Sequence, residues 1–145
     1  MKRIVLVTIF ASLLLFGAIS NQSFGATGHS YVLDWGGFGF SKEGQFFKPQ
    51  NLATDDEQNI YVTDSGNSRV QKFTSDGKFL LSWGTNGKED GQFLLPTGIA
   101  TFENFVYVVD SKNFTVQKFD SDGNFILKWG EFGYKSGQFN FAKGI

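Results

Sequence analysis

The chain has 145 residues, which is enough for one ordinary domain, and its apolar fraction of 41% is close to that of a globular protein. Because it contains no cysteine, a disulfide framework and a thiolate metal site are both excluded. The formal net charge is -1 and the basic residues are scattered singly, so the sequence lacks the clustered basic footprint that is typical of nucleic-acid binders.

The first 26 residues have the pattern of a secretory signal peptide. A positively charged start precedes the uncharged apolar run Ile4–Ile19, and small residues follow it. This order predicts cleavage after Ser20 or near Gly25. An uncleaved anchor helix is the alternative, although the run is slightly shorter than the ~20 residues that a membrane span needs. In both cases we expect residues 27–145 to be extracytoplasmic, in a secreted or cell-surface protein.

The first predicted strand is Tyr31–Trp35, and it ends in the dipeptide Trp-Gly. Two later strand-like runs, Leu80–Trp83 and Ile126–Trp129, end in the same dipeptide. Tyr31–Trp35 therefore has the form of the last strand of a unit whose other strands lie elsewhere. A long glycine-rich link, Gly36–Gln50, follows it.

Two similar units come next, each with four predicted strands. The second strand of each unit has the strongest β signal, because it is rich in β-branched and aromatic residues. Between the third and fourth strands, Asp-Gly turns at Ser75–Lys78 and Ser121–Asn124 predict tight hairpins with positive φ. The predicted strands are Leu52–Thr54, Asn59–Thr63, Arg69–Phe73 and Leu80–Trp83 in the first unit, and Gly98–Thr101, Phe105–Val109, Thr115–Phe119 and Ile126–Trp129 in the second.

The two units are copies of each other. Tyr61–Ser65 matches Tyr107–Ser111 with an offset of 107 − 61 = 46 positions, and Val70–Phe73 matches Val116–Phe119 with the same offset. The tripeptide Gly-Gln-Phe recurs three times and places the units at about 46–93 and 93–139, with a third beginning at 139. A repeat of roughly 40–50 residues with several short strands is typical of a β-propeller blade. The predicted fold is therefore an all-β propeller of four-stranded blades, incomplete in this chain.

The repeat resembles the NHL family. Pro96–Ala100 has the Pro-x-Gly-Ile-Ala start of the family motif, and Tyr61–Asp64 has its aromatic-Val-x-Asp strand end. Asn67–Phe73 has the Asn-x-Arg-Val-Gln-x-Phe segment that follows. The resemblance covers about residues 30–145. It implies a ring of about six blades, in which the first strand completes the last blade.

The chain departs from the family pattern in three places. Asn51-Leu52 stands where Gly-Ile is expected, and Ala142 stands where proline is expected. Thr115 occupies the position of Arg69, so a pairing of that arginine with the aspartate at the strand end would be lost in the second blade.

Two blades cannot close a ring, and open blades would leave sheet edges bare. Two interpretations remain open. The chain is a fragment of a longer protein, which we favour because it ends within a repeated motif, or several chains assemble so that three pairs of blades complete the ring.

By these arguments, the chain is predicted to be an exported scaffold that binds a protein or an extracellular ligand through its loops and is not catalytic by itself. No cofactor, nucleic acid or membrane is expected as a partner, apart from an uncleaved signal segment. A propeller lyase or lactonase with a metal in the central channel is the alternative, and RNA binding is disfavoured by export and negative charge. The candidate binding residues are Ser65, Asn67, Arg69, Lys112, Asn113 and Phe114.

Other polar residues favour structural roles. Asp64 and Asp110 end equivalent strands. The resemblance to the NHL family implies that they brace the loops by hydrogen bonds, with Arg69 pairing in the first blade, and their recurrence in both repeats favours this structural role. The acidic runs Asp55–Glu57 and Asp120–Asp122 fall at turns and offer too few convergent oxygens for a calcium site.

The remaining features have similarly simple explanations. The only histidine, His29, is expected at the surface. The periodic Phe and Trp residues are expected to pack blade against blade. Asn113-Phe114-Thr115 is a glycosylation sequon in a predicted loop, and a second sequon at Asn21 falls in the signal region.

Overall fold

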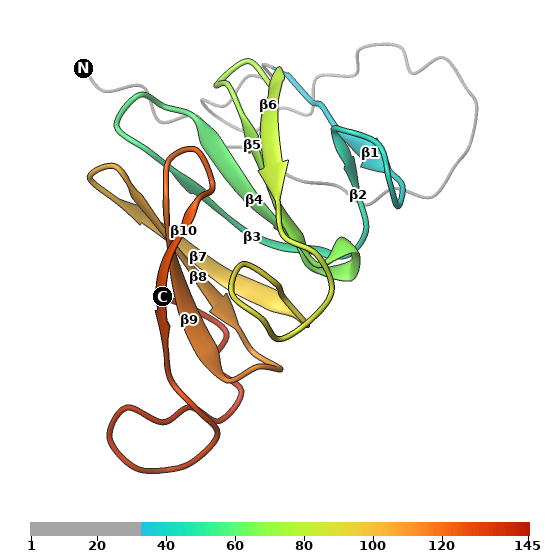
Figure 1. The fold of residues 1–145 in the computed structure, drawn as a ribbon. Helices are drawn as coiled ribbons and strands as arrows, with labels where there is room; N and C mark the ends of the chain where they lie inside the picture. Colours follow the sequence, from blue (N-terminus) through green and yellow to red (C-terminus); the bar gives the residue numbers. More distant parts are fainter. Residues whose placement is uncertain (1–32) are drawn as a thin grey trace, which may run out of the picture.

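A computed structural model describes residues 33–145. The predicted signal segment, His29, and Tyr31 and Val32 of the first predicted strand lie outside the described residues. The described part is all-β: two four-stranded antiparallel sheets lie side by side, with a short two-stranded ribbon beside the first (Figure 1). Within residues 33–145 there is no helix long and apolar enough to span a membrane.

Each four-stranded sheet is one blade, and its strands follow chain order from the inner edge to the outer edge. Blade 1 has a 3-10 turn, η1 (Ser65–Asn67), between its second and third strands. The strands of blade 1 are β3 (Pro49–Thr54), β4 (Ile60–Asp64), β5 (Arg69–Phe73) and β6 (Phe79–Trp83), and those of blade 2 are β7 (Pro96–Phe102), β8 (Phe105–Asp110), β9 (Thr115–Asp120) and β10 (Phe125–Trp129).

The predicted Asp-Gly hairpins are confirmed. Gly77 and Gly123 have φ of 84° and 82°, a left-handed conformation that glycine adopts without steric cost. In the first hairpin the Thr74 N–H donates to the Lys78 carbonyl at 2.9 Å, which closes the turn. Both turns therefore set the register of the outer strands.

The predicted strand Tyr31–Trp35 is wrong over its described residues, because Leu33–Gly36 forms no strand. The Trp35 side chain still occupies the position expected from the repeat. Its ring lies 4.5 Å from that of Phe73, centroid to centroid, and a Cβ placed on Gly77 would meet it at 2.4 Å. Packing of the aromatic ring fixes this residue without ladder hydrogen bonds.

The link Gly36–Gln50 is more ordered than the sequence indicated. It contains β1 (Gly37–Phe38) and β2 (Gln45–Phe46), which pair in parallel, and β3 begins at Pro49 rather than Leu52. Parallel bridges at Asn86↔Phe93 and Phe132↔Phe139 close the later links in the same way. The pairing arises because the phenylalanine of each Gly-Gln-Phe is drawn toward the core, and this brings the two arms of the link together.

The main core lies between the blades. Tyr61 and Val70 of blade 1 are fully buried against Phe93, Val108 and Phe119 of blade 2. A second cluster on the other face of blade 1 contains Phe46, Ile60, Val62 and Phe73, with Trp35 packed against it. Trp83 and Phe93 confirm for one pair of blades that the periodic aromatic residues pack blade against blade.

Polar contacts also cross the interface between the blades. The Lys72 ammonium donates to the Ser121 carbonyl at 3.0 Å, and the Thr101 hydroxyl donates to the Thr54 carbonyl at 2.6 Å. Within blade 1, the Tyr61 hydroxyl donates to Asp55 at 2.9 Å. Burial, followed by this hydrogen bond to Asp55, raises the pKa of Tyr61 far above its ordinary value, so the phenol remains a neutral donor. The acidic run at Asp55–Glu57 thus contributes a structural carboxylate, as expected from its place at a turn.

Replacing Phe93 by alanine should destabilise the protein by about 3 kcal/mol or more, because this fully buried ring fills the space between the blades. Phe139→Ala is the matched control, since Phe139 has the same repeat position but is only half-buried. Urea unfolding of both variants measures the difference. Equal losses of stability would show that the interface between the blades is not the main core.

Candidate binding surface

The two blades share a loop end and a hairpin end. The loop end carries η1, the turn after Asp110 and the links between blades. The hairpin end carries the turns that join the first strand of each blade to the second and the third strand to the fourth (Figure 1). The links reach from residue 36 to 48, from 84 to 95 and from 130 to 141, and all six predicted binding residues lie at this end.

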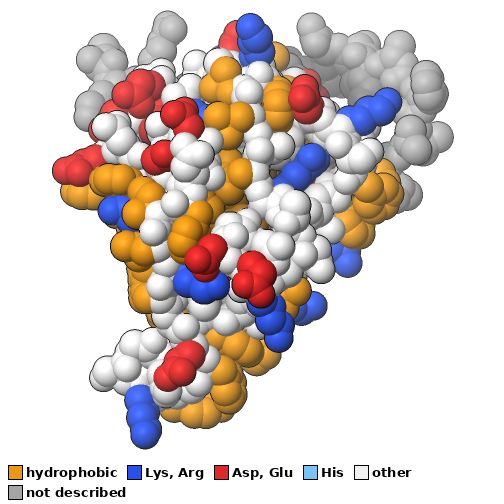
Figure 2. All heavy atoms as spheres, in the orientation of Figure 1, with side chains coloured by type: hydrophobic (Ala, Val, Ile, Leu, Met, Phe, Trp, Pro, Cys, Tyr) orange, Lys and Arg blue, Asp and Glu red, His pale blue; other side chains and the backbone are white. Residues whose placement is uncertain are grey.

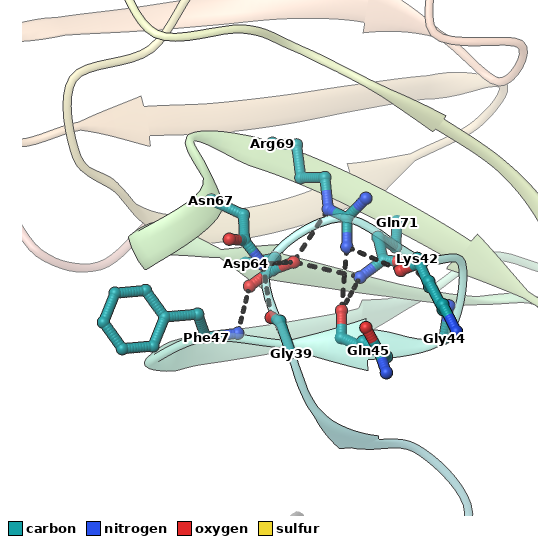
Figure 3. Close-up of polar contacts among 9 residues, drawn as sticks. All are labelled: Gly39, Lys42, Gly44, Gln45, Phe47, Asp64, Asn67, Arg69 and Gln71. Carbon is teal, nitrogen blue, oxygen red and sulfur yellow. Dashed lines mark hydrogen bonds and ion pairs between the residues drawn. The ribbon is translucent and has the colours of Figure 1, made fainter.

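A buried carboxylate holds the loop end of blade 1 (Figure 3). Asp64 is 0% exposed, and one carboxylate oxygen accepts the Phe47 N–H at 2.7 Å. The other oxygen accepts from Asn67 Nδ2 and Arg69 Nε, both at 2.8 Å, and from Gln71 Nε2 at 3.0 Å. Every lone pair of a buried carboxylate needs such a donor, so the predicted bracing role and the pairing with Arg69 are confirmed.

Two residues that donate hydrogen bonds to Asp64, Arg69 and Gln71, also hold the preceding link. Arg69 Nη2 donates to the carbonyls of Lys42 at 3.0 Å and Gln45 at 2.8 Å. The Gln71 amide donates to Gln45 at 2.7 Å and accepts from the Gly44 N–H at 3.1 Å. The link is thus bonded to β5 along much of its length, which makes it a rigid platform.

Blade 2 repeats this arrangement without the arginine. Asp110 accepts the backbone N–H groups of Leu94 and Leu95 at 2.8 and 2.9 Å, and Asn113 Nδ2 at 2.7 Å. Thr115 replaces the arginine, and its buried hydroxyl has no partner within the described residues. The predicted loss of the pairing in blade 2 is therefore confirmed, and backbone donors compensate for it.

The expected exposure of the candidate binding loops is wrong in part. Ser65 is 3% exposed and donates its hydroxyl to the Pro96 carbonyl. Asn67 and Arg69 belong to the Asp64 network, and only Lys112 of the six residues is fully exposed. The turn is short, and it carries the donors that the buried carboxylate requires, so these side chains point inward.

The glycosylation sequon is also turned inward. Asn113 Nδ2 donates to Asp110 and, at 2.9 Å, to the Gly87 carbonyl, so both of its hydrogens are used. Its Oδ1 is buried. A glycan on this nitrogen is incompatible with the folded turn.

The exposed large apolar side chains of the links at this end are aromatic. Phe38 and Phe40 are 68% and 61% exposed, and their rings lie 5.1 Å apart in an edge-on arrangement. The Phe47 ring contacts both, and the Lys48 ammonium lies 5.2 Å from its centroid. We call Phe38, Phe40 and Phe47 the first aromatic cluster.

A second aromatic cluster consists of Phe114, Phe132, Tyr134 and Phe141. The Phe114 ring packs edge-on against Phe132 and Phe141 at 4.9 and 5.5 Å, and Tyr134 is 82% exposed. Phe114 has φ of 57°, a conformation that is uncommon for a bulky residue. The equivalent residue of blade 1, Ser68, has φ of 54°. The turn therefore fixes the backbone conformation at this position, whichever side chain occupies it.

A cavity of about 390 Å³ lies at the loop end, beside the second cluster. It opens between the starts of the two inner strands and the last residues of the chain. Its lining residues are Gln50, Asn51, Leu95, Thr97, Ser111, Phe141 and Lys143.

Charges are unevenly distributed between the two ends. Acidic side chains gather at the turns of the hairpin end, in the upper left of Figure 2, whereas the links of the loop end carry lysines and acidic residues in equal number. Hydrogen bonds from Asn124 hold the pKa of Asp120 below its usual range, which fits a turn residue. Among residues 33–145, no three His, Cys, Asp or Glu side chains are grouped to hold a metal ion.

Sequence reasoning identified Phe114 of the second aromatic cluster but missed the other exposed aromatic residues and the cavity. A signal was present, because the links differ between copies: Phe38, Asn86 and Phe132 share one repeat position. Variable positions on a repeated frame are those that the frame itself does not need.

Comparison with known proteins matches the NHL repeat to residues 48–73 and 93–119. The protein brain tumor of Drosophila melanogaster is 38% identical over 74 residues, which are 51% of this chain and 7% of that protein. A solved structure from Bacteroides fragilis, of a protein named as exported, has a TM-score of 0.54 and 16% identity, and covers 66% of this chain and 27% of that one. The chain thus spans a small part of both proteins, and the predicted propeller fold is confirmed.

Replacing Arg69 by threonine, the residue of blade 2, should lower the free energy of unfolding by about 2–3 kcal/mol, because it removes charge-assisted hydrogen bonds from a buried carboxylate. Lys128→Thr is the control. Its ion pair with Asp90 has the same 2.8 Å separation but is exposed, so the expected loss is about 0.5 kcal/mol.

Denaturant unfolding and hydrogen exchange at Gly44 report the two effects of Arg69→Thr, on stability and on the link. A loss for Arg69→Thr no greater than for Lys128→Thr would contradict the bracing role.

Proposed function

Because the chain carries two NHL repeats, we propose that it is a protein-binding propeller scaffold whose binding surface is the loop end. The observation that carries the proposal is the exposure of two aromatic clusters at the loop end, the first of them on a link that the buried Asp64 holds in place. Exposed apolar patches mark interaction sites, and aromatic residues supply much of the binding energy of protein interfaces. Since the links are already ordered, little conformational entropy is lost when a partner binds.

We propose an extracytoplasmic location. The N-terminal pattern of positive, apolar and small residues supports it. The exported protein of Bacteroides fragilis gives additional support by analogy, since it has a similar fold.

We also propose that the role is binding rather than catalysis. The two carboxylates at strand ends, Asp64 and Asp110, are engaged in holding links, and this supports a scaffold role. A lyase or lactonase with a channel metal would need ligands beyond those grouped in residues 33–145.

Binding to an extracytoplasmic partner, once captured by chemical cross-linking, should weaken at least tenfold in the double variant Phe38→Ala, Phe40→Ala. Leu80→Ala is the control, because Leu80 is 42% exposed on β6, away from the loop end. Affinities of purified proteins measured by calorimetry decide the matter. Unchanged affinity in the double variant, or an equal loss in the control, would rule out the first cluster as a contact surface.

Self-assembly remains a proposal with a specific surface. Blade 1 meets blade 2 through Ala53, Tyr61, Val70, Lys72 and Trp83. Blade 2 carries the same residue types at the equivalent positions of its far face, which we call the rear face: Ala100, Tyr107, Val116, Lys118 and Trp129. We propose that the rear face packs against another blade.

The rear face of one copy would pack against blade 1 of a second copy. There Trp35 already occupies the position beside Phe73 and Gly77 that Trp129 of the first copy would take, so assembly between copies requires Trp35 to be displaced. The chain from residue 27 onward should then form oligomers that Trp129→Ala disrupts and Trp35→Ala favours. Light scattering measures the mass. A well-folded monomer in all three proteins would contradict assembly between copies.

A further inference from the structure

We infer that the cavity at the loop end binds a carboxylate group carried by an acidic segment of the partner protein. This inference rests on the proposed function and names the chemistry of the partner. It comes from how three successive repeats meet at one place.

Three residues of one repeat position converge on the cavity. Gln50 and Thr97 each follow the first residue of an inner strand, and Lys143 has the same repeat position in the tail. The positions are 50, 50 + 47 = 97 and 97 + 46 = 143, and all three residues line the cavity. The tail lies in the register of an inner strand, because Thr97 and Ser111 donate to the Ala142 carbonyl. In the same way, Thr63 and Ser65 of blade 1 donate to Thr97 and Pro96.

The three equivalent residues differ in kind, although the frame around them repeats. An amide, a hydroxyl and an ammonium occupy the position, and all three are hydrogen-bond donors. If the position served only the fold, one residue type would suffice, as with Asp64 and Asp110. The position is therefore available for a ligand.

The donors at the cavity are largely unused. Within residues 33–145, the side chains of Gln50 and Lys143 make no hydrogen bond or ion pair, and the Asn51 side chain only accepts, from the Leu52 N–H. Thr97 is different, because its hydroxyl is 2.6 Å from that of Ser111. Two amides and one ammonium are thus free to bind a ligand at the cavity.

The charge of the lining selects an anion. Lys143 is a full cation, and none of the lining residues is acidic. The nearby Asp110 is 0% exposed and its oxygens are occupied by backbone donors. An ionised carboxylate only accepts hydrogen bonds, so it matches a set of donors around one positive charge.

The apolar part of the lining indicates how the carboxylate arrives. Leu95 and Phe141 provide a wall against which the methylene groups of a glutamate side chain can pack. Phe141 also belongs to the second aromatic cluster, through its contact with Phe114. A segment with an acidic side chain in the cavity therefore continues directly onto exposed aromatic rings, which favours a polypeptide over a free acid.

The test uses two blocked peptides that differ in one charge, acetyl-Phe-Glu-Phe-amide and acetyl-Phe-Gln-Phe-amide. Titrations followed by NMR should show the glutamate peptide binding about fivefold to tenfold more tightly, with the largest shifts at Asn51 and Lys143. Lys143→Met keeps the aliphatic part of the side chain but removes its charge, so this variant should bind the two peptides with equal affinity. Lys135→Met, which removes an exposed lysine of the neighbouring link, should leave it unchanged.

Each alternative outcome overturns the inference in a recognisable way. Equal binding of the two peptides, no binding of either, or a preference that survives Lys143→Met shows that the cavity does not select a carboxylate. Tighter binding of glutarate than of the glutamate peptide assigns the cavity to free acids instead. None of these results affects the test of the aromatic clusters, so failure here is distinguishable from failure of the proposed function.

Discussion

The structure of the loop end depends on one buried carboxylate per blade. Asp64 lies at the end of β4 with no exposed surface, and a charge in that position is tolerated only if donors surround it. The donors come from the turn, from β5 and from the preceding link, so a single electrostatic requirement ties three segments together. In blade 2 the requirement is met by backbone N–H groups, which shows that the carboxylate is constant whereas its counter-charge is replaceable.

This division of labour separates structure from recognition within each repeat. The residues nearest the carboxylate face inward, and this is why the turn that looked suited to binding is mostly buried. At the loop end, the large apolar side chains that face outward belong mainly to the links, and Gln50 and Lys143 are exposed at a repeat position where the copies differ. Aromatic clusters and an unpaired ammonium are consequently held on a frame that does not need them.

Much of the fold was predictable because the chain contains two copies of the same sequence unit. Repetition located the four strands of each blade and the Asp-Gly hairpins, and the resemblance to the NHL family implied the pairing of Asp64 with Arg69. The prediction failed at Leu33–Gly36, because an alternating pattern does not reveal whether a neighbouring strand is available for pairing. The cavity was out of reach for a related reason: Gln50, Thr97 and Lys143 are far apart in the chain, and only the packing of successive inner strands brings them together.

The Asp64 network is contained within one repeat, and this has a consequence for how repeat proteins of this kind diversify. All of its partners lie between Gly39 and Gln71, inside one repeat length, so a duplicated segment carries the complete means of anchoring its own link. A copied unit can then accumulate substitutions at Phe38 or Phe40 without unfolding its neighbour. Recombination between units would exchange a link together with the residues that anchor it. New binding specificities would then arise without changes to the core.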